Sequence, residues 1–467
     1  MVRANIFARS AMGLALAMGV AAVGFSAAEA KDKKPPEAPA PKLSDKFKRA
    51  AGPAIAALEA AAKRADVLAQ RQKTVQALQK FNSTRDKAAK EAALAGYNTE
   101  LAALQAMLTK ELGLVQAAAA AAENADDKMT AGQLLAYYAN IAMDKPNQKA
   151  GLQLQLDSGK LSPEQAASAH HDLGRLALDA GDYPGAQREL KLAVDGGFVK
   201  DEAEFQLANA YLLDKQLPLG LKLLHGAIVR NGATTPEYWI DNGVVIAFNN
   251  KLPAETTLLA SDLVTYYPTK ANWSRAIFTV TTINKYAGQE RLDLLRLRDR
   301  TGSFEDGSDY VDYIVYADPK RLPAEVLRMI DQGIAAGMIT LATPVDGVGN
   351  TVGKLQTQAR GRVAEDKSLL VVQERDARGP RADAATVVGA ADTFLSHSMS
   401  AQAEEMYRLA LTKPGVDAGR VNLRLGIALI DQGKYAEAIE AFAKVTDARG
   451  PIAQLWTVYA KNKLAGK

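Results

Sequence analysis

Cysteine is absent from this 467-residue chain, and its absence excludes several kinds of structure and chemistry. Without cysteine there is no disulfide framework, no thiolate nucleophile and no Cys-ligated metal. A lipid anchor of the bacterial lipoprotein type is excluded too, because it requires a cysteine at the cleavage point. The folded chain must rely on packing, for which its 48% hydrophobic content is sufficient.

Histidine is scarce, and the four that occur are His170, His171, His225 and His397. Two are adjacent and point to different faces of a helix, and none belongs to an H-E-x-x-H or H-x-x-E-H motif. The G-x-S-x-G motif of serine hydrolases is missing as well. We therefore expect no metal site, no cofactor and no enzymatic activity.

Aromatic residues make up only 6% of the chain, whereas carbohydrate-binding grooves usually align aromatic rings on an exposed face. The net charge of +4 is too small to predict nucleic-acid binding. Most of the basic surplus lies in residues 31–49, where seven Lys or Arg accompany three Asp or Glu. We interpret this stretch as a solvated tether; contact with an anionic lipid or polymer is the alternative.

The first thirty residues have the pattern of a bacterial signal peptide. Arg3 and Arg9 form a basic start, a run of apolar and small residues extends from Met12 to Phe25, and Ala28-Glu29-Ala30 offers a cleavage site. Cleavage after Ala30 predicts a periplasmic protein with no transmembrane span; retention as an anchor helix is the alternative. Residues 31–44, with four prolines, are expected to form an extended linker.

Residues 45–128 form an N-terminal region in which apolar residues recur at helical spacing. Two long helices are predicted, over 45–81 and 87–123, with a turn at Asn82-Ser83-Thr84. We expect them to form a helical hairpin. A coiled-coil arm that makes the chain a homo-oligomer through residues 45–123, and a set of degenerate repeats, are the alternatives.

Three later segments share one spacing of small and apolar residues, and the first two are offset by 34 residues. The first copy contains Leu173, Gly174, Ala177, Gly181, Tyr183, Ala186, Leu190 and Ala193. The second contains Leu207, Ala208, Tyr211, Leu217, Gly220, Leu224 and Ala227. The third contains Leu425, Gly426, Leu429, Gly433, Tyr435, Ala438 and Phe442. Small residues at fixed positions allow two helices of a hairpin to approach closely.

This spacing resembles the tetratricopeptide (TPR) repeat family. The resemblance implies an all-α fold, a TPR-like α-solenoid of antiparallel helical hairpins that follows the N-terminal long helical hairpin. Repeats are expected over 131–341, an irregular connecting region over 342–380, and C-terminal repeats with a capping helix over 381–467. Within the connecting region we expect a loop followed by one or two irregular helices.

In TPR domains the first helix of each hairpin lines a concave face. The resemblance therefore implies these peptide-binding residues: His171, Arg175, Phe205, Gln206, Asn209, Ile240, Phe248, Arg275, Phe278, Arg420 and Arg424. Packing of the phenylalanines between hairpins is the alternative. Arg420 and Arg424 resemble the basic pair with which some family members hold a peptide carboxylate. Val388 and Asp392, however, stand where that clamp has Lys and Asn, so a dedicated clamp is not expected.

The functional expectation is a periplasmic, non-enzymatic scaffold that binds a protein or peptide partner in the cell envelope. Envelope assembly, export and cell division are the processes that the resemblance implies. The alternative is a structural component that handles peptidoglycan or an exported polysaccharide. Fold alone does not separate these functions.

Overall fold

A computed structural model describes residues 40–200, 202–345 and 349–466. In these ranges 77% of the residues are helical, no strand is formed, and the one β-type pairing is an isolated bridge between Pro344 and Thr351. The all-α solenoid-like class is thereby confirmed. The predicted signal peptide and most of the predicted linker lie outside the described residues.

The chain divides into two compact units, with the boundary between Asp214 and Lys215. The boundary falls inside the range 131–341 that the sequence predicts as one series of repeats. Each unit is described by itself below.

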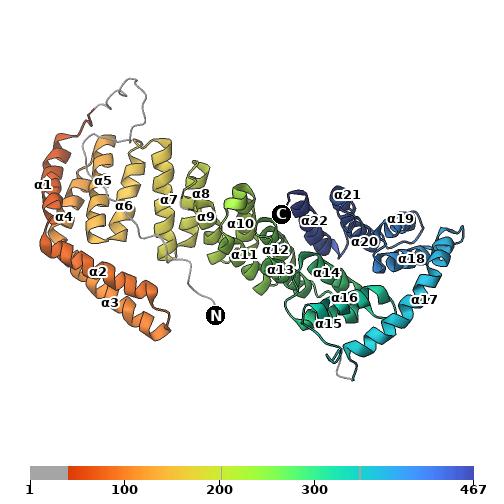
Figure 1. Cartoon of the computed structure of the whole chain (residues 1–467). Helices are drawn as coiled ribbons and strands as arrows, with labels where there is room; N and C mark the ends of the chain where they lie inside the picture. The colour runs from red at the N-terminus through yellow and green to blue at the C-terminus, as the bar shows by residue number, and fades with distance from the viewer. Residues whose placement is uncertain (1–39, 201, 346–348, 467) are drawn as a thin grey trace, which may run out of the picture. The chain divides into compact units, whose positions relative to one another are not determined.

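The first unit is a series of paired helices (Figure 1). They are α1 (Asp45–Ala61), α2 (Ala65–Ser83), α3 (Lys87–Ala106), α4 (Thr109–Ala120), α5 (Ala125–Ala142), α6 (Lys145–Asp157), α7 (Pro163–Ala180), α8 (Tyr183–Asp195) and α9 (Ala203–Leu213). The antiparallel pairs α5–α6 and α7–α8 pack most extensively, followed by the α2–α3 hairpin. Phe47, Leu58, Leu104 and Tyr138 belong to one buried cluster that joins α1, α3 and α5.

The N-terminal hairpin is present as α2 and α3, but each predicted long helix is divided into two. Arg64 adopts an extended backbone at the start of α2, and its guanidinium contacts Asp66 and Glu111. The turn before it lets α1 pack on α4 and α5 while α2 packs on α3. If residues 45–81 formed a single straight helix, the apolar face of either the α1 segment or the α2 segment would have been exposed. No proline or glycine marks the break, so the sequence pattern does not reveal it.

Close approach of helices within a pair depends on glycine. A Cβ atom on Gly132 would lie 2.6 Å from the Gly151 carbonyl oxygen, and one on Gly174 would lie 2.5 Å from Leu190 Cγ. Side chains at these positions would push the two helices apart. Gly174 and Leu190 are positions of the repeat pattern, so the spacing identifies a real packing constraint.

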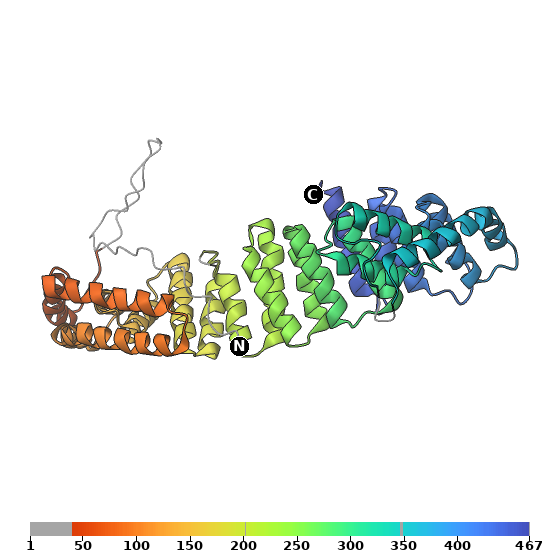
Figure 2. The ribbon, with the colours of Figure 1, turned by 60° about the horizontal axis from the view of Figure 1, so that its bottom comes forward.

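The second unit contains the remaining helices, which Figures 1 and 2 show from two directions. They are α10 (Leu217–Asn231), η1 (Gly232–Thr234), α11 (Glu237–Asn249), α12 (Pro253–Tyr266), α13 (Lys270–Ile283), α14 (Gly288–Thr301), α15 (Gly307–Ala317), α16 (Pro323–Ala335), α17 (Val352–Arg378), α18 (Ala384–Ser396), α19 (Ser400–Ala410), α20 (Ala418–Ile430), α21 (Tyr435–Phe442) and α22 (Gly450–Leu464). Within the predicted irregular region 342–380, α17 is one helix of 27 residues.

The last helix, α22, connects the end of this unit to its beginning. It packs on α21, as expected of a capping helix, and also on α12, α13 and α14. The Trp456 indole N–H donates to the Asp293 carbonyl at 3.1 Å, and the Asn462 amide donates to the Val264 carbonyl at 2.8 Å. The second unit therefore returns on itself and does not end as an open stack.

The repeat pattern makes a direct prediction at Gly426 in α20. A Cβ atom there would overlap the Phe442 ring of α21, and both residues are buried. We expect Gly426→Leu to lower the free energy of unfolding by about 1–3 kcal/mol through overpacking. Gly389→Ala in α18 is the control, because that Cβ meets nothing within 4 Å. Thermal unfolding compares the two; equal melting temperatures would show that α20 and α21 do not pack as described.

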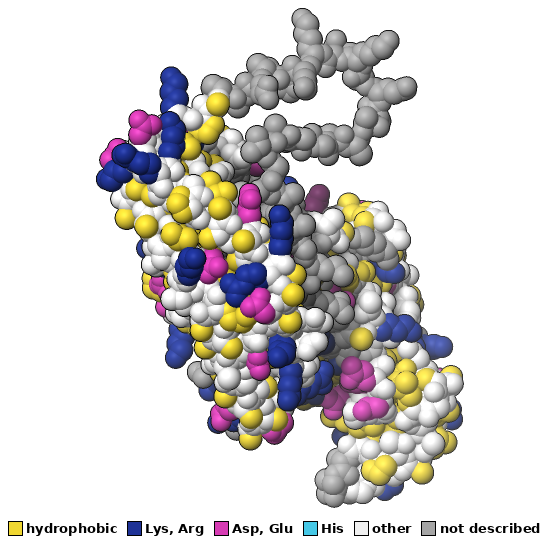
Figure 3. Space-filling model, turned by 90° about the vertical axis from the view of Figure 1, so that its left-hand side faces the viewer, with side chains coloured by type: hydrophobic (Ala, Val, Ile, Leu, Met, Phe, Trp, Pro, Cys, Tyr) yellow, Lys and Arg dark blue, Asp and Glu magenta, His cyan; other side chains and the backbone are white. Residues whose placement is uncertain are grey.

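No helix in the described part of the chain has both the length and the apolar character needed to cross a membrane. On the face shown in Figure 3, Lys and Arg side chains are interspersed with acidic and hydrophobic ones. The α2–α3 hairpin exposes Leu68 and Leu94, at 51% and 39%. Oligomerisation through residues 45–123 stays a prediction.

Candidate functional site

The candidate site is a pocket of about 840 Å³ in the second unit. Its wall combines residues of α10, α12 and α22 with one residue that follows α13. The lining residues are Pro218, Leu221, Lys222, His225, Pro253, Ala254, Glu255, Thr257, Leu258, Leu259, Asn284, Gly450, Pro451 and Gln454. A largely apolar wall with a few polar groups, at this volume, is typical of ligand-binding pockets.

The three helices that form the pocket begin in the same way. Each has one proline at its first or second position, namely Pro218, Pro253 and Pro451. Proline suits the start of a helix because its fixed φ is helical and its missing N–H would have no partner there. The helices therefore start at the pocket, and their first turns form much of its wall.

His225 is the titratable group of the wall with a defined partner. Its Nδ1 atom lies 2.7 Å from Oδ2 of Asp262 on α12, and the imidazole side chain is 28% exposed. The hydrogen bond to Asp262 raises the pKa of His225 above its ordinary value, against the effect of burial. Burial in turn raises the pKa of Asp262. The carboxylate thus fixes the orientation of the ring and favours its charged form.

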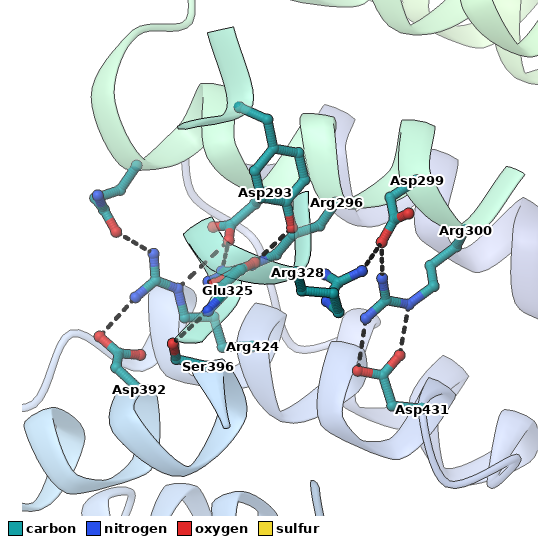
Figure 4. A network of polar contacts seen from close by, with 12 residues as sticks. Asp293, Arg296, Asp299, Arg300, Glu325, Arg328, Asp392, Ser396, Arg424 and Asp431 are labelled. Atoms are coloured by element: carbon teal, nitrogen blue, oxygen red, sulfur yellow. Dashed lines mark hydrogen bonds and ion pairs between the residues drawn. The ribbon is translucent and has the colours of Figure 1, made fainter. Parts of the chain in front are cut away.

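A separate group of charges lies buried between the helices of the second unit (Figure 4). The Arg296 guanidinium on α14 donates to both carboxylate oxygens of Glu325 on α16, at 2.8 and 2.7 Å. It also donates to Asp293 at 2.7 Å. Burial alone would raise the pKa of Glu325, but the Arg296 charge and hydrogen bonds outweigh it and hold the pKa at about 2.

Arg424 on α20 extends this network toward α18. Its guanidinium donates to Asp392 at 2.7 Å and to the Gln289 side chain at 2.6 Å, and lies 3.4 Å from Asp293. The Glu325 backbone N–H donates to the Ser396 hydroxyl at 3.2 Å. The network therefore joins α14, α16, α18 and α20.

A second branch of charges connects α14 and α16 with the residue that follows α20. Arg300 donates to both carboxylate oxygens of Asp431, at 2.7 and 2.9 Å, and also contacts Asp299. Arg328 donates to Asp299 at 2.8 Å. Because the members of both branches are turned toward one another (Figure 4), we interpret the network as structural.

Five of the eleven residues predicted for a peptide groove lie in the interior. His171, Phe205, Asn209, Ile240 and Arg424 are buried. His171 stacks on Phe198 at 4.4 Å between ring centroids. The structure thus places these five where side chains pack, which is the alternative that the sequence left open for Phe205.

The other six predicted residues are more accessible. Gln206, Phe248, Arg275 and Arg420 are half-buried, whereas Arg175 and Phe278 are exposed. Arg275 pairs with Asp241, and Arg420 donates to Asp392 at 2.6 Å. Among the residues that line the pocket, none comes from the predicted set.

Sequence reasoning considered His225 only as a metal ligand. Its partner Asp262 is 37 residues away, so no local motif connects them. The prolines that open three helices were the available signal, but nothing in the sequence shows that these helix starts meet. In the described part of the chain no group of three or more His, Cys, Asp or Glu is placed to hold a metal.

In comparisons with known proteins, neither a family model nor a curated protein matches this sequence.

Proposed function

We propose that the chain is an exported, non-enzymatic scaffold that binds a segment of a protein partner in the periplasm. The observation that carries this proposal is the pocket of the second unit, whose largely apolar wall is formed by the first turns of paired helices. The repeat spacing adds to it, and we include kinship with TPR proteins in the proposal. Cell-envelope assembly, export or division is the setting that the signal-peptide pattern favours.

Handling of a polysaccharide has less support at this site. Sugar rings are commonly held by stacking on the side chains of Phe, Tyr or Trp. No Phe, Tyr or Trp occurs among the described residues that line the pocket, whereas Leu221, Leu258 and Leu259 do. Aliphatic side chains suit the apolar residues of a peptide.

Affinity capture with a pocket-filling variant tests the proposal. The mature chain from Lys31 onward serves as bait for an envelope extract, alongside Ala254→Phe. Ala254 is an exposed residue in the second position of α12, at the pocket wall, so a phenylalanine there fills the pocket without disturbing the core. We expect the wild type to capture a partner and Ala254→Phe to lose it.

The matched control is Ala385→Phe. Ala385 is also exposed and also occupies the second position of a helix, α18, but it does not line the pocket. This variant should capture the partner as the wild type does. Capture that survives in Ala254→Phe, with circular dichroism unchanged, would place the binding surface elsewhere.

A further inference from the structure

The first turn of α12 leaves two backbone donors at the pocket wall. Ala254 and Glu255 both line the pocket, and the residue before the helix, Leu252, has no side-chain oxygen with which to cap their N–H groups. The first bond of this turn runs from the Thr256 N–H to the Leu252 carbonyl. Within the described residues the N–H groups of Ala254 and Glu255 have no acceptor. Such donors, at the positive end of the helix dipole, favour an anionic ligand.

Thr257 provides an independent indication of a missing partner. It lines the same wall, is 3% exposed, and its hydroxyl makes no hydrogen bond within the described residues. Other hydroxyls of this helix, such as those of Thr256 and Ser261, donate to the carbonyl four residues earlier. A buried hydroxyl without a partner is uncommon, because its desolvation costs about 1–3 kcal/mol.

Two basic side chains, Lys222 and His225, line the pocket from α10. Lys222 is exposed, and His225 is held through its Nδ1 atom by Asp262. The hydrogen bond of His225 within the described residues is made by Nδ1, so Nε2 is the ring atom left for a ligand. In the protonated ring this atom carries an N–H donor. Glu255 is the single acidic residue among the described residues that line the wall.

We propose that the pocket binds an acidic side chain, Glu or Asp, within an aliphatic segment of the protein partner. The carboxylate accepts from the α12 first turn, from His225 Nε2–H and from Lys222. The neighbouring aliphatic side chains contact Leu221, Leu258 and Leu259. The inference rests on the proposed binding function and specifies the chemistry of the segment that is bound.

A defined peptide pool tests this inference without knowledge of the partner. The probe is a set of hexapeptides, blocked at both ends, with one central Glu among Ala, Val, Leu and Pro; a matched pool carries Gln. Immobilised mature protein selects from each pool, and mass spectrometry measures the enrichment. Members of the Glu pool should be enriched about tenfold or more over their Gln counterparts, as a lost charge-assisted hydrogen bond implies.

His225→Gln should remove most of that preference, whereas His170→Gln should keep it. His170 is the matched control, because it is also paired with a carboxylate, Glu189 at 2.8 Å, but lies outside the pocket. Circular dichroism verifies that both variants fold. Equal loss of the preference in both variants would overturn the assignment of His225.

The pH dependence of the enrichment gives a second test. The charged groups that face His225 are Asp262 and Glu255 of α12 and Lys222 of its own helix; α22 and the residue after α13 contribute the neutral Gln454 and Asn284. The raised pKa of His225 keeps the ring charged below that pKa and neutral above it. Enrichment of the Glu pool should therefore be stronger at about pH 5.5 than at about pH 8.5, because Glu stays ionised at both.

Failure of the inference differs from failure of the proposed function. If Glu and Gln pools are enriched equally, the pocket binds peptides but the carboxylate assignment is wrong. A third pool, without Glu but with a free C-terminal carboxylate, reports chain-end recognition; enrichment of that pool alone would overturn the inference. If no pool is enriched while the wild type and Ala254→Phe capture the same partner, binding occurs at another surface.

Discussion

Replacement of Arg296 by Met is expected to destabilise the second unit by about 3–5 kcal/mol, because it leaves buried carboxylates without their cation. Arg296 is 2% exposed and contacts both Glu325 and Asp293. The Arg296→Met/Glu325→Met double variant should regain much of the loss, since it removes both charges of the main pair. Chemical denaturation of the whole chain, followed by circular dichroism, measures the effect.

Arg362→Met is the control for Arg296→Met. Arg362 lies on α17 and pairs with Glu365 at 2.9 Å, three residues away, as Arg296 pairs with Asp293. Both members of the Arg362 pair are more than half exposed, so its loss should cost about 1 kcal/mol or less. Similar small effects for the two variants would show that the network of Figure 4 does not hold α14 and α16 together.

Trp456→Ala is the second substitution with a large expected effect. Its indole is fully buried, stacks on Phe442 at 6.1 Å between centroids, and meets Tyr459 edge to face at 5.9 Å. We expect a loss of about 3–5 kcal/mol in the free energy of unfolding, from lost burial and the cavity left behind. Thermal and chemical unfolding measure it.

Leu464→Ala on the same helix is the control, because that leucine is 58% exposed. Its replacement should lower the free energy of unfolding by about 0.5 kcal/mol or less. Trp456→Phe keeps an aromatic ring but removes the hydrogen bond to the Asp293 carbonyl. This variant should lower the free energy of unfolding by less than Trp456→Ala does. If Trp456→Ala unfolds no more easily than Leu464→Ala, α22 does not close the second unit.

Local packing was the part of the fold that the sequence could predict. Gly174 with Leu190, and Gly426 with Phe442, lie on neighbouring helices joined by short turns, so the spacing of small and large residues reports their contact directly. The helix pairs follow from this spacing. The division of the N-terminal helices does not, because the turn before Arg64 depends on what α1 and α2 pack against.

Contacts between residues that are distant in sequence could not be predicted from the spacing of small and apolar residues. Trp456 and Asp293 are 163 residues apart, and helical periodicity shows that a face is buried without showing which helix buries it. The pocket is of this kind, since its wall joins residues 218–225, 253–259 and 450–454. Positions predicted for a groove, such as Ile240 and Arg424, were judged by register alone, which does not distinguish an exposed face from one covered by another helix.

Site-specific photo-crosslinking tests the central claim, that the pocket of the second unit receives a protein partner. A photoreactive residue is introduced at Ala254, on the pocket wall, and for comparison at Val371, which is 77% exposed on α17 and outside the pocket. Irradiation of cells that express each variant should give a discrete protein adduct from position 254 and not from position 371. Absence of an adduct at 254, or the same adducts from both positions, would contradict the account.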